Sequence, residues 1–271
     1  MNKALTAAER VAIARHPQRP NISDYISALF TDFFEQRGDR LSGEDASVLG
    51  GVALYHGHPV TVIGTRKGKD LEENLLCRFG MPNPEGYRKA LRLMRQAEKF
   101  RRPVITFIDT GGAYPGLEAE ERGQGEAIAR NLLEMSRLRV PVVSIITGEG
   151  NSGGALALGV ANRVLMLENA VYAILSPEGF AAILWKDAKR HEEASELMKL
   201  TASDLQELGV VDEIILEPGG GAHLARSITF RQVDEALSRN LNQLSRVKNL
   251  AAARYQKFRQ MGTAAPRKEN P

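Results

Sequence analysis

The sequence contains very little cysteine: Cys77 is the only one in 271 residues. A single cysteine cannot form an internal disulfide or a thiolate-rich zinc site within this chain. No histidine lies close to Cys77 in the sequence, which favours an unreactive thiol. The five histidines are scattered along the chain, and we predict no metal site.

Long apolar runs are also missing. The run Val140–Thr147 is far too short to cross a bilayer, and Met1–Arg15 lacks the apolar block of a signal peptide. The composition, with 43% hydrophobic and 25% charged residues, is typical of soluble globular proteins. We therefore expect a cytoplasmic protein without a membrane partner.

The net charge is mildly positive, at +3, and it is unevenly distributed. Seven basic residues gather near the C-terminus, opposed almost only by Glu269: Arg246, Lys248, Arg254, Lys257, Arg259, Arg267 and Lys268. A solvated terminal helix explains such a cluster, and we favour that interpretation. A basic tail can also bind an acidic partner or nucleic acid, so a nucleic-acid role stays open as the weaker alternative.

The apolar pattern divides the chain into three parts. Residues 1–20 are a short polar arm, residues 21–245 an α/β domain, and residues 246–271 a basic C-terminal helix or tail. Helices are predicted over 21–36 (with Ser23 as N-cap), 87–100, 118–139 and 152–160, strands over 49–55, 59–65, 103–109, 140–147, 163–167 and 171–175, and a loop over 66–74. The later strands are apolar on both faces and separated by helices, which indicates a parallel sheet covered on both sides.

Two glycine-rich segments follow strands directly. They are Asp109–Gly116 and Gly148–Ala155, each between a strand and a helix. In a parallel sheet with right-handed crossovers both lie at the carboxyl edge, where open α/β sheets bind ligands. Glycine lets backbone N–H groups approach a ligand closely, and the start of the following helix adds unpaired N–H donors. The two segments therefore predict an oxyanion hole or anion cradle.

Other phosphate-binding and nucleophile motifs do not fit these segments. Neither continues into the Gly-Lys-Ser/Thr of a P-loop, and neither matches the dinucleotide fingerprint. Asn151-Ser152-Gly153 lacks the spacing of a serine nucleophile elbow, and no histidine is placed to act as its base. With no evident base, metal ligand or thiol, the chemistry would depend on positioning and electrostatics, with reactive groups supplied by a cofactor and a substrate.

Five longer motifs complete the pattern: Asp24–Phe30 with Gly38-Asp39-Arg40, Phe79–Ala90, Ala119–Ala129, Ser176–Gly179 and Leu184–Lys186. Together they resemble the alpha subunits of bacterial acetyl-CoA carboxylase carboxyltransferase, densely from Asp24 to Leu216 and more loosely to Arg259. The chain departs from that family at Gly111, where a proline is common, and at Gly148–Ser152, where a Gly-Ser pair is usual.

The resemblance implies an α/β fold of the crotonase (ClpP/crotonase-like) type, a spiral of β-β-α units with helical N-terminal and C-terminal extensions. It implies transfer of a carboxyl group from carboxybiotin to acetyl-CoA, giving malonyl-CoA in the first committed step of fatty acid biosynthesis. The biotin belongs to a biotin carboxyl carrier protein and is not attached to this chain. Further expected partners are a carboxyltransferase beta subunit in an α2β2 assembly, which would hold the zinc and most of the acyl-CoA site, and biotin carboxylase in the full ATP-using complex.

The resemblance also assigns roles to residues. Backbone N–H groups of the catalytic set are expected to hold the ureido oxygen of carboxybiotin: Gly111, Gly112, Ala113, Gly153 and Gly154. The cofactor-binding residues expected around them are Tyr114, Pro115, Gly116, Ser152, Lys67, Tyr87 and Arg88. The biotin nitrogen then takes the proton from the acetyl methyl group, so no side-chain base is required. A relative acting on another acyl-CoA or on a malonyl carrier, such as a decarboxylase subunit, shares these loops and is the closest alternative.

Overall fold

Two apolar stretches form the centre of the sheet in the computed structural model, which describes residues 5–262. Strands β4 (Val104–Thr110) and β5 (Val142–Asn151) are buried at every position, as expected for parallel strands covered on both faces. The other strands are β1 (Thr31–Glu35), β2 (Val48–Tyr55), β3 (His58–Thr65), β6 (Arg163–Leu167), β7 (Val171–Ala173) and β8 (Glu213–Ile215).

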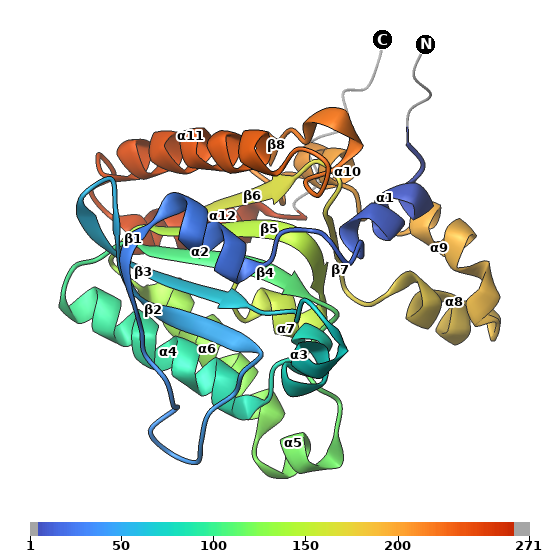
Figure 1. Cartoon of the computed structure of the whole chain (residues 1–271), viewed down its shortest axis with the longest axis horizontal. Coiled ribbons are helices and arrows are strands. Elements are labelled where there is room, and N and C mark those ends of the chain that lie inside the picture. The colour runs from blue at the N-terminus through green and yellow to red at the C-terminus, as the bar shows by residue number, and fades with distance from the viewer. Residues whose placement is uncertain (1–4, 263–271) are drawn as a thin grey trace.

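The sheet has the strand order β1-β2-β3-β4-β5-β6-β8, and β7 pairs with the last residues of β5. β2 and β3 form the predicted antiparallel hairpin, whereas β3, β4, β5, β6 and β8 run parallel. The carboxyl ends of β4 and β5 therefore lie side by side at one edge of the sheet, and the segments that follow them start from the same place (Figure 1).

Helices cover both faces of the sheet (Figure 1). α4 and α6 pack against each other on one face, and α2 and α11 meet on the other. The longer helices are α2 (Ile22–Leu29), α4 (Pro84–Lys99), α6 (Gln124–Arg137), α11 (Arg226–Leu244) and α12 (Leu250–Gln260). The shorter helical elements are α3 (Leu71–Leu76), η1 (Arg78–Gly80), α5 (Leu117–Glu121), α7 (Ser152–Leu156), η2 (Ala188–Arg190), α10 (Ala202–Glu207) and η3 (Pro218–Gly220).

A lobe formed by α8 (Pro177–Trp185) and α9 (His191–Leu197) projects from the side of the molecule (Figure 1). The N-terminal helix α1 (Ala7–Ala14) packs against α9, and the N–H of Ala7 donates to Glu196 at 2.7 Å. The described part of the N-terminal arm therefore contains a helix that packs against the lobe.

The stretch 21–36 is not the single helix that the pattern predicted. α2 ends at Leu29, and residues 31–35 form β1, which pairs with β2. Tertiary pairing decides here, because the threonine and phenylalanines of this stretch suit a strand as well as a helix. The N-cap is Asn21 rather than Ser23: its side chain accepts hydrogen bonds from the N–H groups of Ser23 and Asp24.

Other predicted boundaries also change. The helix predicted over 118–139 is divided into α5 and α6 at Gly123, whose φ of +85° ends one helix before the next begins. The predicted loop at 66–74 contains the start of α3, capped by Asp70. Residues 148–151 continue β5 as a strand, because they pair with β7, and the helix predicted over 152–160 ends at Leu156.

The basic C-terminal region is only partly solvated, which corrects the interpretation above. Arg254 is buried, and its guanidinium donates to the carbonyl oxygens of Met135 and Leu138 at 2.7 and 2.8 Å. Lys257 is paired with Asp212. Two of the seven clustered charges thus hold the terminal helix to the body, and the last two, at 267 and 268, lie outside the described residues.

Candidate active site at the carboxyl edge of the sheet

The two glycine segments touch each other. A methyl group built on Gly154 would lie 2.4 Å from the backbone nitrogen of Ala113 and 2.5 Å from the carbonyl carbon of Gly112. Side-chain carbons do not approach backbone atoms so closely, so glycine is required at this position. The structure therefore brings Gly112, Ala113 and Gly154 together, as the strand–helix pattern predicted.

Thr110 shapes the first segment. Its Oγ1 donates to the carbonyl oxygen of Gly112 at 2.8 Å and accepts from the N–H of Gly112 at 3.1 Å. Gly112 has a φ of +132°, which favours glycine. A methyl group on Gly111 would meet nothing within 4 Å, so close packing does not require glycine at this position.

The second segment enters α7 through a sharp turn. Ser152 has a φ of +60°, which is unusual for a residue with a side chain. No side chain caps α7, so the N–H groups of Gly153 and Gly154 in its first turn have no partner within the helix. Free backbone donors beside the Gly112–Ala113 peptide are the arrangement that an oxyanion hole needs.

Tyr87 lies directly behind this contact. Its side chain is fully buried, and its hydroxyl, which has no hydrogen-bond partner, would be 2.8 Å from a methyl group on Gly154. Burial raises the pKa of the Tyr87 hydroxyl, so the group is neutral at physiological pH. The backbone of the neighbouring Tyr114 is held by two hydrogen bonds: its N–H donates to the carbonyl oxygen of Pro82, and its carbonyl oxygen accepts from the side-chain amide of Gln124.

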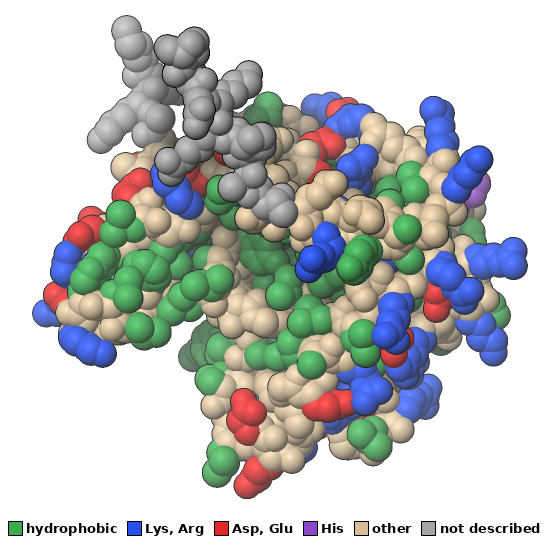
Figure 2. Space-filling model, turned by 180° about the vertical axis from the view of Figure 1, so that it is seen from behind, with side chains coloured by type: hydrophobic (Ala, Val, Ile, Leu, Met, Phe, Trp, Pro, Cys, Tyr) green, Lys and Arg blue, Asp and Glu red, His purple; other side chains and the backbone are tan. Residues whose placement is uncertain are grey.

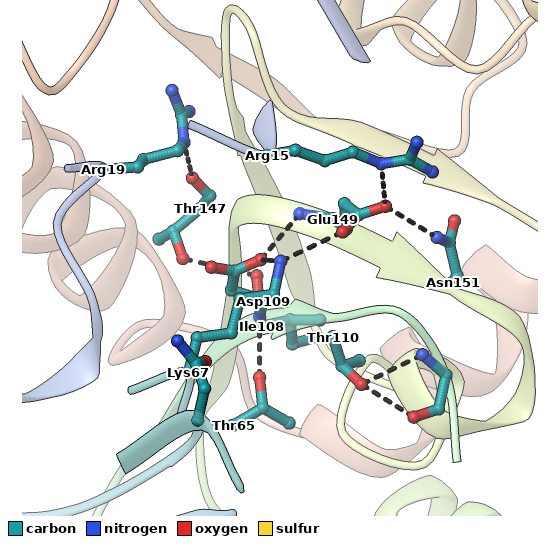
Figure 3. Close-up of polar contacts among 12 residues, drawn as sticks. Arg15, Arg19, Thr65, Lys67, Ile108, Asp109, Thr110, Thr147, Glu149 and Asn151 are labelled. Carbon is teal, nitrogen blue, oxygen red and sulfur yellow. Dashed lines mark hydrogen bonds and ion pairs between the residues drawn. The ribbon is translucent and has the colours of Figure 1, made fainter. Parts of the chain in front are cut away.

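Lys67 belongs to a second cluster, which is made of charged side chains at the ends of β3, β4 and β5. Its ammonium lies 2.7 Å from Asp109 and 3.0 Å from Glu149, and Arg15 lies 2.8 Å from the other oxygen of Glu149 (Figure 3). Burial lowers the pKa of Lys67, but the two carboxylates outweigh this effect and raise it. Burial likewise raises the pKa of Glu149, and Lys67 and Arg15 outweigh it, so the carboxylate is ionised.

The other predicted cofactor-binding residues, Arg88, Pro115 and Gly116, are not part of the contact between Gly154 and Ala113. Arg88 pairs with Asp39 at 2.8 Å and with Glu85 at 3.1 Å, so its guanidinium is occupied within the chain. Pro115 and Gly116 lead from the glycine contact into α5, and Gly116 is the N-cap of that helix.

The sequence analysis did not predict this cluster of charged side chains. Asp109 was noted only as the first residue of a glycine segment, and Glu149 only as part of the stretch Gly148–Ser152 that departs from the family pattern. A signal was present, since each acid stands at the end of a strand and parallel strand ends meet at one edge. Arg15 gave no signal, because its contact with Glu149 joins parts of the chain that only the fold brings together.

An apolar cavity of about 540 Å³ opens beside Ser152 and Gly153. Tyr172, Phe180 and Leu208 are among the residues that line it. The adjacent lobe carries exposed apolar side chains, and Figure 2 shows them gathered over the lobe, at the left, next to a hollow. The most exposed side chains of the lobe are Ile183 (62%), Leu197 (59%) and Leu184 (58%), and Ile174 (76%) lies just before α8.

Residues 5–262 contain no group of three or more histidine, cysteine or acidic side chains that could hold a metal ion. Cys77 is buried, and its thiol donates to the carbonyl oxygen of Ala46 at 3.4 Å. Within the same described range, every helix is too short or too polar to span a bilayer.

The fold is that of the carboxyltransferases of the crotonase type. Residues 1–262 match the family model described as acetyl co-enzyme A carboxylase carboxyltransferase-like, and the chain belongs to this family. It is 61% identical over 260 residues to the acetyl-coenzyme A carboxylase carboxyl transferase subunit alpha of Geobacillus kaustophilus, covering 95% of this chain and 80% of the relative. The subunit of the same name from Listeria monocytogenes is 56% identical, covering 95% and 82%.

Solved structures support the same fold at low sequence identity. Transcarboxylase 12S, with methylmalonyl-coenzyme A and methylmalonic acid bound, superposes with a TM-score of 0.69 at 16% identity, covering 98% of this chain and 47% of that one. A chain of a Pseudomonas malonate decarboxylase hetero-tetramer in complex with coenzyme A gives a TM-score of 0.69 at 18% identity, covering 85% and 90%. The similarity to the malonate decarboxylase chain therefore concerns the fold alone and does not indicate that this chain is a decarboxylase subunit.

Proposed function

We propose that this chain is the alpha subunit of an acetyl-CoA carboxylase carboxyltransferase and holds the biotin side of the reaction. The reaction transfers a carboxyl group from carboxybiotin to acetyl-CoA and gives malonyl-CoA. The proposal is carried by the contact of Gly154 with the Gly112–Ala113 peptide, which gathers backbone donors from two segments at one point. Acetyl-CoA is favoured as the acceptor because relatives 56–61% identical carry that activity in their names.

The residues around this point fit a biotin ring. The ring is a compact bicycle with an apolar thioether edge and a polar ureido edge. The cavity beside Ser152 and Gly153 is mainly apolar, and the first-turn N–H groups of α7 lie next to it. When bound, carboxybiotin supplies the carboxyl group and a nitrogen that can accept a proton.

This chain contributes fixed dipoles rather than a base. The N–H groups of Ala113 and Gly154 stabilise negative charge on the ureido oxygen, and each such donor is worth about 3 kcal/mol in a water-poor site. Thr110 and the close contact at Gly154 hold the donors in place before reaction, so little reorganisation is needed. We assign the oxyanion contact to backbone groups, and not to Lys67 or Arg88, whose charges are already paired.

We propose that a beta subunit docks on the exposed apolar side chains of the lobe, Ile183, Leu184 and Leu197. The lobe adjoins the cavity that we assign to the biotin ring, so a chain docked there would bring its acyl-CoA site against the biotin side. Following the resemblance, the beta subunit holds the zinc and most of the acyl-CoA site in an α2β2 assembly. The carrier protein presents the biotin, biotin carboxylase completes the complex, and the expected location is the cytoplasm.

Leu184→Glu is expected to weaken binding of the beta subunit at least about tenfold, because a charge would replace an exposed apolar side chain of the proposed docking surface. The measurement is the dissociation constant from analytical ultracentrifugation or calorimetry. Leu41→Glu is the matched control, since Leu41 is 77% exposed but lies in the loop between β1 and β2. Equal affinities for both variants would place the partner on another surface.

The activity itself is tested by mixing this chain with a beta subunit, malonyl-CoA and biotinyl-lysine and measuring acetyl-CoA release. Turnover is expected from the pair and not from either chain alone, because each chain supplies half of the site. No turnover from the pair, or full turnover from one chain alone, would reject the proposal. Replacing malonyl-CoA by methylmalonyl-CoA tests the acceptor, and a faster reaction with it would move the assignment to another acyl-CoA.

A further inference from the structure

Five side chains of alternating charge connect the lobe to the glycine contact. Glu178, near the start of α8, lies 2.6 Å from Arg15, and Arg15 lies 2.8 Å from Glu149. Glu149 lies 3.0 Å from Lys67, which lies 2.7 Å from Asp109 (Figure 3 shows the four residues from Arg15 to Asp109). The hydrogen bonds of Arg15 lower the pKa of Glu178 to about 2, so this end of the row is ionised.

Asp109 connects this row to the backbone of both strands. Its carboxylate accepts the N–H of Glu149 at 2.9 Å, and its own N–H donates to Thr65 at 2.7 Å. A methyl group on Gly148 would lie 2.4 Å from its Oδ1, so the carboxylate occupies the space that this glycine leaves. The pairing of β4 with β5 shifts register at this point, between Ile108 and Thr110. The residue after Asp109 is Thr110, which shapes the Gly112 turn.

Lys67 is the only cation of the described residues within ion-pair distance of both Asp109 and Glu149. Without it, the carboxylates of Asp109 and Glu149, which both contact the same ammonium group, would face each other as like charges. The lysine is 23% exposed and lies on the wall of a cavity of about 580 Å³ that several charged side chains line. Protons can therefore reach the pair from solvent.

We infer that Lys67 is a positioning residue: by bridging Asp109 and Glu149, it holds the ends of β4 and β5 so that the two glycine segments meet. The inference rests on the proposed function, because the segments matter only if they hold the oxyanion. Lys67 then acts on the position of the backbone and does not contact the cofactor. It also gives the partner-binding lobe a connection to the oxyanion donors, through Arg15 and Glu178.

The charged and titratable groups around this pair come from every neighbouring element. From the N-terminal segment and α2 they are Arg15, His16, Arg19, Asp24 and Tyr25; from the loop after β3, Lys69; from α8, Glu178; and from the segment after β8 and the start of α11, Glu217, His223 and Arg226. Most of these are committed to other partners, among them Arg19 to Glu217 and Lys69 to Asp24. None of these described groups is within ion-pair distance of both Asp109 and Glu149, so none of them can take the place of Lys67.

Lys67→Met, tested in the complex with the beta subunit, is expected to lower kcat about 10- to 100-fold at pH 8, since a displacement of about 1 Å has such an effect. KM for biotinyl-lysine is expected to change little. As the pH falls, kcat is expected to recover, because protonation of Glu149 removes its repulsion with Asp109, whereas the wild-type complex shows no such recovery. Lys67→Met/Glu149→Gln removes the like-charge repulsion and is expected to restore kcat at pH 8.

Two results would overturn the inference. One is a wild-type pH profile in Lys67→Met, and the other is a loss confined to KM for biotinyl-lysine, which would make Lys67 a cofactor ligand. Lys69→Met is the matched control: Lys69 is on the same loop, 59% exposed, and pairs with Asp24.

Amide hydrogen exchange of residues 110–113 decides the inference independently of turnover. Exchange is expected to become faster in Lys67→Met and to stay unchanged in Lys69→Met, and equal exchange in both would reject the inference. A wild-type complex without activity would reject the proposed function instead.

Discussion

Gly154→Ala is expected to lower kcat of the complex by at least about 100-fold, the effect of losing one oxyanion donor. The added methyl group would lie 2.4 Å from the nitrogen of Ala113, so the two segments must separate. The buried hydroxyl of Tyr87, 2.8 Å from the same methyl position, closes the other side. The measurement is kcat in the malonyl-CoA assay, together with beta-subunit affinity and circular dichroism, which are expected to stay unchanged.

Two comparisons make this result specific. Gly125→Ala is expected to leave activity unchanged, because Gly125 is exposed on α6 and its methyl group would meet nothing within 4 Å. Gly153→Ala is expected to have a smaller effect than Gly154→Ala, since its methyl group would lie 3.5 Å from Ile128, an ordinary contact. Equal losses at positions 153 and 154 would show that contact with Ala113 is not what matters.

Arg19→Met is expected to lower the free energy of unfolding by about 3–5 kcal/mol, the effect of leaving a buried charge without its partner. Arg19 and Glu217 form a bidentate pair with side chains 2% and 0% exposed, and Arg19 also donates to the carbonyl of Thr147 at 2.5 Å. The cation keeps the pKa of Glu217 low despite its burial. Urea unfolding of the purified chain measures the loss.

The pH dependence of that loss has a defined sign. Without Arg19, burial raises the folded-state pKa of Glu217 above its unfolded value of about 4.3. The destabilisation is therefore present at neutral pH and shrinks as the pH falls toward the unfolded pKa. Arg19→Met/Glu217→Gln is expected to recover much of the stability at pH 7, whereas Arg37→Met, which removes a solvent-exposed partner of Glu35, is expected to change stability little. A loss that does not depend on pH would contradict this explanation.

The sequence predicted the centre of the fold well and its margins less well. β4 and β5 are recognisable because continuous apolar runs between helices have few other solutions. β1 was taken for helix, since Phe30, Phe33 and Phe34 fit an apolar stripe in either structure and pairing with β2 decides between them. The extension of β5 through residues 148–151 depends on β7, a partner that local pattern cannot reveal.

One part of the candidate site could be predicted from the sequence and another part could not. The backbone donors followed from glycine placement, because strand–glycine–helix segments in a parallel sheet must share an edge. The charged row did not, because Arg15, Lys67 and Glu149 come from three distant parts of the chain. The burial of Arg254 was hidden for the same reason: its acceptors are carbonyl groups more than a hundred positions earlier, and carbonyls carry no sequence signal.

The central claim is that backbone groups of two converging segments hold the ureido oxygen. A crystal structure of this chain with its beta subunit and biotinyl-lysine tests it most directly. The account predicts that the ureido oxygen lies about 3 Å from the nitrogens of Ala113 and Gly154, the distance of an N–H···O hydrogen bond. A ureido oxygen bound by a side chain or a metal ion, and more than about 4 Å from both nitrogens, would contradict it.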